Sequence, residues 1–220
     1  MSTAANGKAA ASLRTEKKRK FKKMKLDKKI EAKIKKQALK LLKIGRTGWD
    51  IRHTLCAVKW MKKLIKFEGG DEKTLIPAIY FHDAGYEELP LGFSHKQCME
   101  LKKKKDHGAA GAKLAKKYLT KIKYFKKPEI ERIAYLIKNH NKHDNIKKFD
   151  RQLIFEADGL AQIDWHNCPP SYDKKNTELF LNTTFKKRMK YIKTKSGKKM
   201  LKRLLAKTEE YLTDRKEANN

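Results

Sequence analysis

Apolar residues recur along most of the chain at the three- and four-residue spacing of amphipathic α-helices. The first pattern, over residues 26–44, predicts a helix that Gly45 ends. The second predicts a helix over residues 51–67, with Asp50 as its N-cap and Gly69 at its break. No stretch alternates apolar and polar residues as a half-buried strand does, so the pattern predicts an all-α fold.

The helical spacing continues through the rest of the chain. Asp71 is predicted to cap a helix over residues 72–82, with Pro77 near its first turn and Gly85 as its stop. Residues 86–105 have no steady period and are predicted to form a long loop, a feature that is often functional in compact domains. Five further helices are predicted over residues 107–122, 128–140, 149–163, 174–194 and 198–214.

The 220 residues are enough for one domain of common size with extensions. The formal charge is +31, and it is concentrated near the ends. Residues 1–45 carry 16 basic against 3 acidic side chains, a net of +13, and residues 174–220 carry 15 against 5, a net of +10. We therefore expect a basic, partly disordered N-terminal extension with one helix (1–45), a core domain (46–170) and basic C-terminal helices (171–220).

A charge of this size attracts polyanions, so nucleic acid is a candidate partner of the basic extensions. Residues 17–25, KKRKFKKMK, are typical of a nuclear address or a nucleic-acid-binding arm. The alternative is a Lys-rich composition that only solvates the surface. Lysine outnumbers arginine, and lysine is the weaker choice for bidentate phosphate binding. Both interpretations stay open.

Compartment and membrane contact are constrained by cysteine usage and hydropathy. Cys56, Cys98 and Cys168 are far apart and form no CxxC pair, which favours a reducing compartment without disulfides. The N-terminus lacks the apolar segment of a signal peptide. The longest apolar run, residues 75–81, is far shorter than the ~20 residues of a membrane span. We expect an intracellular, cytoplasmic protein with no membrane partner, or a nuclear one if the chain is eukaryotic or viral.

The candidate chemistry begins with the adjacent pair His82 and Asp83, which ends an apolar run. Burying both groups costs several kcal/mol unless they are paired or bind a metal. His53 lies in the first turn of its predicted helix, Asp158 borders the apolar face of residues 149–163, and His107 and His140 lie at helix ends.

Each of these residues also has an ordinary structural interpretation. A histidine near a helix C-terminus is favoured by the helix dipole, and a helical aspartate is often only solvated. Taken together, however, several helices each deliver a histidine or an aspartate beside an apolar face, which favours a shared site.

The motifs DIRH at 50–53, IYFHDAGY at 79–86 and FEADGL at 155–160 resemble the HD-domain superfamily of metal-dependent phosphohydrolases. DHGAAGAKLA at 106–115 and LIKNHNK at 136–142 look like a branch of small HD hydrolases. The similarity covers about residues 49–164, in order and at workable spacings. It implies an all-α HD-domain helical bundle, to which the basic N- and C-terminal helical extensions are additions.

The resemblance implies that His53, His82, Asp83 and Asp158 ligate a first metal. His107 and His140 match positions that in many members bind a second metal or the substrate phosphate. With two ions about 3.5–4 Å apart, Asp83 is the candidate bridging and catalytic carboxylate. Imidazole and carboxylate ligands suit divalent Mn, Fe, Zn, Co or Ni, with Mg as a further option, and one or two ions.

The chain departs from the family pattern at several positions. Glu156 replaces the first Asp of a D-A-D motif, and Gly159 stands where Arg is frequent. An Arg commonly found one turn after the first His is missing, so phosphate contacts are expected from Arg52, Lys59 or a lysine of 102–105. Glu68 is a lesser candidate for proton transfer, with a surface role as the alternative. His95, His143 and His166 are expected at the surface.

These features predict an enzyme, a phosphohydrolase that acts on a phosphoester or phosphoanhydride through a metal-activated water. The expected substrate is a phosphorylated small molecule of the nucleotide type. The alternative is a basic nucleic-acid-binding protein in which an HD-type core holds a structural metal.

Overall fold

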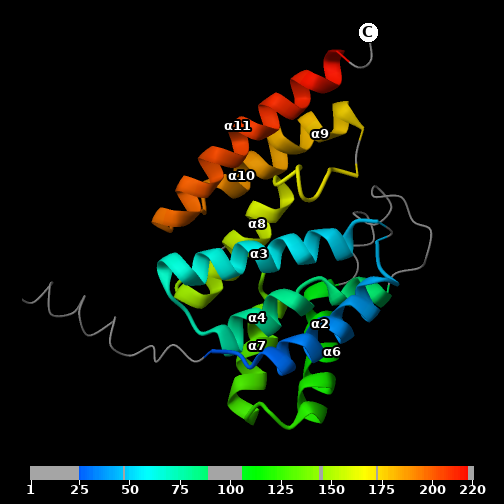
Figure 1. The fold of residues 1–220 in the computed structure, drawn as a ribbon, viewed down its shortest axis with the longest axis vertical. Helices are drawn as coiled ribbons and strands as arrows, with labels where there is room; N and C mark the ends of the chain where they lie inside the picture. Colours follow the sequence, from blue (N-terminus) through cyan, green and yellow to red (C-terminus); the bar gives the residue numbers. More distant parts are fainter. Residues whose placement is uncertain (1–24, 47, 89–105, 144–145, 172, 218–220) are drawn as a thin grey trace, which may run out of the picture.

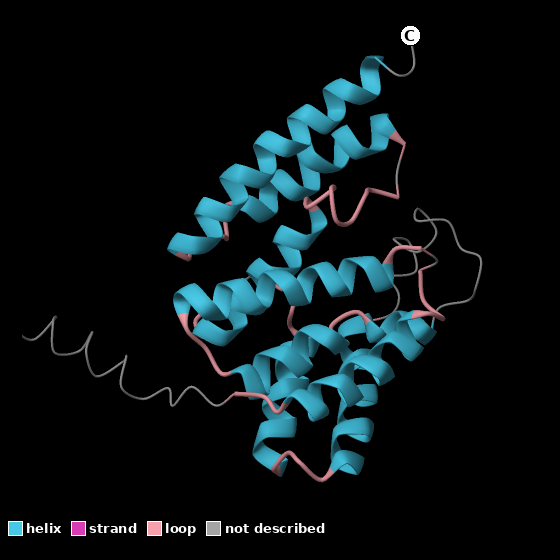
Figure 2. Ribbon diagram, viewed as in Figure 1, coloured by secondary structure: helices cyan, strands magenta, loops and turns pink. Residues whose placement is uncertain are grey.

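The protein is an all-α structure, as the helical periodicity predicts (Figure 2). The computed structural model describes residues 25–46, 48–88, 106–143, 146–171 and 173–217. These residues form helices and turns without a β-strand. None of the helices in these ranges combines the length and the apolar character needed to cross a membrane.

The helices follow one another along the described residues. In order, they are α2 (Lys28–Leu42), α3 (Asp50–Glu68), α4 (Glu72–Phe81), the 3-10 helix η1 (Ala84–Glu88), α6 (His107–Ile122), α7 (Lys127–Lys138), α8 (Phe149–Gln162), α9 (Lys174–Phe180), the π-helix η2 (Leu181–Phe185), α10 (Lys186–Met189) and α11 (Lys195–Glu217).

Two groups of helices lie on either side of α3 (Figure 1). The lower group in that view contains α2, α4, α6 and α7, with α6 packed on α7 and α4 on α7. The upper group contains α9, α10 and α11. Helix α8 packs against α3 and also contacts α4 and α11, so it joins the two groups.

One of the two predicted side-chain caps is confirmed. The Asp71 carboxylate accepts hydrogen bonds from the Lys73 backbone N–H (3.0 Å) and the Thr74 hydroxyl (2.6 Å) at the start of α4. The predicted N-cap role of Asp50 is wrong. Its carboxylate points back to Arg46, accepting from the backbone N–H and from Nε at 2.6 Å each, and Trp49 stands at the cap position without a side-chain bond.

The region after α4 differs from the predicted loop. Residues 84–88 form η1, while the remainder of the predicted loop, residues 89–105 with His95 and Cys98, lies outside the described residues. Gly85 also allows two helices to pack closely. A Cβ at this position would overlap the backbone carbonyl of His107, so the glycine lets η1 pack directly against the start of α6.

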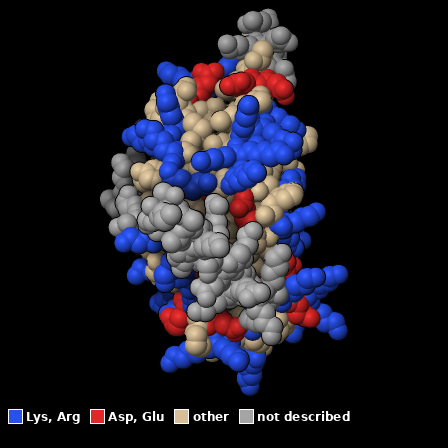
Figure 3. All heavy atoms as spheres, turned by 90° about the vertical axis from the view of Figure 1, so that its left-hand side faces the viewer, with Lys and Arg blue, Asp and Glu red and all other residues tan. Residues whose placement is uncertain are grey.

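The C-terminal region contains more breaks than the two predicted helices. Residues 174–189 are divided into α9, η2 and α10, and α11 begins at Lys195. Phe185 and Ile192 are buried against the core, as is Leu204 from α11. Figure 3 shows lysine and arginine side chains gathered over the upper part of one face, the part that contains these helices.

Helix α8 is buried along almost its whole length. Every residue from Arg151 to Ala161 is buried, including Glu156 and Asp158. Two carboxylates buried on one helix need partners on different sides, because side chains two positions apart point in roughly opposite directions. These partners define the candidate site on one side and the attachment of α11 on the other.

Candidate metal centre

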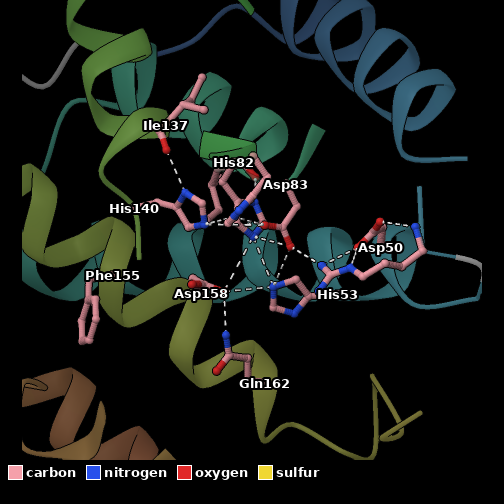
Figure 4. Close-up of polar contacts among 12 residues, drawn as sticks. Asp50, His53, His82, Asp83, Ile137, His140, Phe155, Asp158 and Gln162 are labelled. Atoms are coloured by element: carbon pink, nitrogen blue, oxygen red, sulfur yellow. Dashed lines mark hydrogen bonds and ion pairs between the residues drawn. The ribbon is translucent and has the colours of Figure 1, made fainter. Parts of the chain in front are cut away.

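Three buried ligand atoms converge where α3, α4 and α8 meet (Figure 4). His53 Nε2 lies 3.0 Å from Asp158 Oδ1 and 3.2 Å from His82 Nε2. His82 Nε2 is 3.7 Å from the same aspartate oxygen. All three side chains are at most 4% exposed.

A second group lies next to the first. His107 Nε2 and His140 Nε2 are 3.3 Å apart, and both are close to Asp83 Oδ1, at 3.6 and 3.5 Å. The other oxygen of Asp83 faces the first group, 3.7 Å from His53 Nε2 and 3.5 Å from His82 Nε2. Asp83 therefore offers one carboxylate oxygen to each pair of histidines.

Different helix positions bring these side chains together. His53 lies in the first turn of α3, His82 is the C-cap of α4 and Asp83 follows it. His107 is the first residue of α6. His140 lies two residues beyond α7, which ends earlier than predicted, and Asp158 comes from the middle of α8. All six residues that the sequence singles out converge.

The Nδ1 hydrogen bonds of two histidines direct their Nε2 atoms toward the shared point, where each can hold a proton or a metal ion. His82 Nδ1 donates to the carbonyl of Ile79 at 2.8 Å, and His140 Nδ1 donates to that of Ile137 at 2.7 Å. Each Nε2 then faces another imidazole nitrogen at close range, which is repulsive unless a proton or cation lies between them. This donor set fits a divalent metal ion.

The pKa values of His82 and His140 shift in opposite directions. Burial lowers the pKa of His82, but the negative charge of Asp83 and the hydrogen bond to Asp158 outweigh it and raise the pKa to about 9. Burial and the neighbouring positive charge of His82 lower the pKa of His140 to about 4. The raised pKa favours a protonated His82 and the lowered pKa a neutral His140, so a metal that binds His82 Nε2 would displace a proton from it.

Both carboxylates stay ionised despite burial. Burial opposes the charge on Asp158, but Arg188 and the hydrogen bond from His53 hold its pKa well below the usual range. Burial likewise opposes the charge on Asp83, and His82 and Arg46 lower its pKa. Ionised carboxylates are the form that binds cations.

Arg46 and Arg188 are the site residues that the sequence reasoning missed. Arg46 Nη2 lies 2.7 Å from Asp83 Oδ2, and Arg188 Nη2 lies 2.8 Å from Asp158 Oδ2. The arginines come from polar segments outside the recognised motifs, so no periodic signal marks them. Of the predicted phosphate contacts, Arg52 and Lys59 are both exposed and do not line the cavity described below, and the lysines of 102–105 lie outside the described residues.

The site opens into a cavity of about 820 Å³ between the core and the C-terminal helices. His53, Asp83, His140 and Asp158 form part of its wall. Residues of α9, η2 and α10 form another part of the wall. The aromatic side chains of Trp49, Phe155, Trp165 and Phe180 also line it, together with the cationic side chains of Arg46, Lys187 and Arg188.

The remaining candidates lie apart from the ligand groups. Glu68 accepts a hydrogen bond from the backbone N–H of Ser196 (2.6 Å), outside the cavity. His166 is exposed, as expected. His143 is also exposed but lines the cavity, with its ring 4.4 Å from that of Tyr191.

A helical bundle with buried histidines and ionised aspartates at one point defines a metal-binding class of protein. The family model of the HD domain matches residues 50–178, more than half of the chain. The chain therefore belongs to the HD-domain family, whose members are generally metal-dependent hydrolases. Comparisons with curated proteins and with solved structures give no match.

Proposed function

We propose that the protein is a phosphohydrolase that uses one or two divalent transition-metal ions to cleave a phosphoester or phosphoanhydride of a nucleotide-like substrate. One observation carries the proposal: Asp83 lies between two histidine pairs, with one carboxylate oxygen toward each, at the wall of a cavity. A carboxylate in this arrangement suits the two-metal sites that many phosphatases use.

The proposed ligands fall into two sets that share Asp83. His53, His82 and Asp158 would hold the first ion together with Asp83, and His107 and His140 would hold the second or contact the phosphate. Ions bound there would neutralise phosphate charge and lower the pKa of a bound water from about 15.7 towards roughly 7.

The chain's own residues prepare the site for an anionic substrate. The backbone carbonyls of Ile79 and Ile137 orient the rings of His82 and His140, so their Nε2 atoms face the shared point. The ring of His107 stacks on Tyr86 at 4.4 Å, and the Arg46 guanidinium lies 3.9 Å from the centroid of the same Tyr86 ring. These contacts restrict side-chain motion before any substrate enters.

The cavity supports the nucleotide-like part of the proposal. Its volume lies within the ~300–1,000 Å³ of typical small-molecule sites. Trp49, which is partly exposed at the cavity, offers an aromatic surface for a base, and Arg46 and Lys187 offer positive charge for phosphate groups.

The test combines elemental analysis of the purified protein with a substrate screen in the presence of the metal found. We expect a divalent transition metal, and turnover of an aryl phosphate or of members of a nucleotide panel. Asp83→Asn keeps the shape of the side chain and removes its charge. It should reduce metal-dependent turnover at least ~100-fold, since even outer-shell changes cost ~10–100-fold.

Glu131→Gln is the matched control, because it removes one carboxylate charge from an exposed pair with Lys116. Its turnover should equal that of the wild type. A wild-type protein that binds no metal and hydrolyses none of the phosphates would refute the proposal.

A further inference from the structure

Arg188 reaches the candidate metal centre from α10, beyond the residues that match the HD family model. Its Nη2 donates to Asp158 Oδ2 at 2.8 Å and to the carbonyl of Phe155 at 2.7 Å. The guanidinium carbon lies 4.1 Å from the centroid of the Phe155 ring. Three contacts therefore fix a side chain that belongs to the C-terminal segment.

Gly159 provides the space that Arg188 occupies. A Cβ on Gly159 would lie 2.7 Å from Arg188 Nε, closer than such atoms approach in proteins. Gly159 stands where arginine is frequent in the family pattern. This chain has no side chain at that position, and a guanidinium from a different helix lies against it.

The hydrogen bonds of the guanidinium show which of its donors are in use. Nη2 carries two N–H groups, and these serve Asp158 and Phe155. Nε is buried and has no hydrogen-bond partner in the described part of the chain. Nη1 has no partner among the described residues either, and the side chain lines the cavity.

The surroundings of Arg188 in the cavity suit an anion. Lys187 is its neighbour in α10, and Thr183 and Thr184 from η2 also line the cavity. The Thr183 hydroxyl already donates to the carbonyl of Leu179, so the charged donors of this part of the wall are Arg188 and Lys187. A phosphate bound there would meet charge-assisted donors, which are the stronger kind of hydrogen bond.

We propose that Arg188 is a phosphate-binding residue that the C-terminal segment contributes to the active site. Its Nη2 holds Asp158 and its Nη1 donates to an anionic oxygen of the substrate in the cavity. A role of Arg188 in catalysis rests on the proposed function. Phosphate binding by Arg188, however, can be measured without any turnover.

The first experiment measures orthophosphate binding to the full-length, metal-containing protein by the shift in its unfolding temperature across a phosphate titration. Arg188→Gln should weaken phosphate binding at least ~10-fold, the effect of losing a charged donor. Lys190→Gln is the matched control, since Lys190 is exposed, adjoins α10 and does not line the cavity. It should bind phosphate as the wild type does.

The second experiment moves Arg188 without changing its charge. In Gly159→Ala the new methyl group should displace the guanidinium and weaken phosphate binding as Arg188→Gln does. In the Arg188→Gln background the same alanine should cause no further loss. Gly159→Ala alone keeps the test decisive even if Arg188→Gln fails to fold.

The outcomes separate the inference from the proposed function. If Arg188→Gln and Gly159→Ala lose phosphate binding at unchanged metal content, the inference stands, even if no substrate is turned over by any variant. If both bind phosphate as tightly as Lys190→Gln, the inference is wrong. It is also wrong if the wild type binds no phosphate, or if phosphate binding falls only where metal is lost.

Discussion

Arg46 is a nearly buried cation held between two carboxylates with different tasks. Asp50, fully buried, accepts from its backbone N–H and Nε, and Asp83, a proposed metal ligand, accepts from its Nη2. A guanidinium in this position joins the segment before α3 to the end of α4. Its loss would leave Asp50 buried without its cation.

Replacing this cation should therefore be costly for stability. We expect Arg46→Gln to lower the free energy of unfolding by about 3–5 kcal/mol, the usual cost of breaking a buried ion pair from one side. Urea denaturation followed by far-UV circular dichroism measures it. Arg52→Gln, at an exposed position of α3, should change the value by less than about 0.5 kcal/mol. Equal stabilities of the two variants would contradict the role given to Arg46.

The buried thiols allow a prediction about pH. Burial and the charge of Asp164 raise the pKa of Cys56, and the same two causes raise that of Cys168 to about 12. Because the thiolate is the reactive form, both thiols in the folded protein should be alkylated at least ~100-fold more slowly at pH 8 than in urea. Alkylation of Cys168 in the folded protein should become faster only as the pH approaches about 12. Peptide mass spectrometry resolves each cysteine, and rapid labelling of either one in the folded protein would contradict the burial.

Residues of the site differed in how well the sequence revealed them. His53, His82, Asp83 and Asp158 stand out because each interrupts an apolar helical face, and the motifs around them match a family. Arg46 and Arg188 lie in segments rich in cations, where one more arginine carries no signal. Which oxygen of Asp83 faces which pair of histidines depends on three-dimensional packing alone.

At the scale of elements, Glu156 attaches α11 to the core. Its carboxylate, completely buried in α8, accepts from the backbone N–H groups of Lys193 (2.7 Å) and Thr194 (2.9 Å), from the Thr194 hydroxyl, and from Gln152 Nε2 (2.7 Å). The carboxylate lies just before α11 begins, where a negative charge is favourable to the helix dipole. A shorter Asp, as in the family pattern, would leave these donors farther away.

Removing this carboxylate should loosen α11. We expect Glu156→Ala to lower the free energy of unfolding by at least about 2 kcal/mol, because several buried donors lose their acceptor. Limited proteolysis should then cut within residues 195–217 faster than in the wild type. Glu131→Ala, which breaks only an exposed ion pair with Lys116, should cost less than about 0.5 kcal/mol. Unchanged proteolysis in Glu156→Ala would argue against the attachment.

The presence of each helix was easier to predict from the sequence than its exact ends and internal breaks. The residues of α6 were predicted at both ends, because its periodicity is regular and Asp106 caps it. The break of residues 174–189 into α9, η2 and α10 was not foreseen, since a π-helical segment of five residues is too short to show a period of its own. The interpretation of Asp50 as a cap failed because its partner, Arg46, lies before the helix rather than inside it.

At the scale of the whole molecule, the positive charge offers a test of the nucleic-acid alternative. Lysine and arginine side chains cover the part of the surface that contains α9–α11 (Figure 3). Exposed basic residues of α11 include Lys198, Lys199, Lys202 and Arg203. If this surface binds nucleic acid, affinity should fall steeply with the logarithm of salt concentration.

Changing these four residues to Gln should reduce the magnitude of the salt slope by up to about 3.6, at roughly 0.9 for each phosphate that the surface no longer neutralises. A control variant carries Gln at four exposed lysines of the core, Lys113, Lys117, Lys121 and Lys123. Its slope should change by less than about 1. Fluorescence anisotropy with a labelled duplex provides the measurement, and an affinity insensitive to salt would remove the nucleic-acid alternative.

The predicted division into an extension (1–45), a core (46–170) and C-terminal helices (171–220) stays a prediction. Helix α8, within the predicted core, nevertheless also holds the C-terminal helices. Glu156 turns toward α11 and Asp158 toward the histidines, two residues apart on one helix.

This pairing limits how such a chain can diversify. Exchanging everything after residue 170 for a segment without counterparts of Arg188 and of the Lys193–Thr194 backbone would leave both carboxylates of α8 short of partners at once. Point changes that keep both attachments would leave these partners in place.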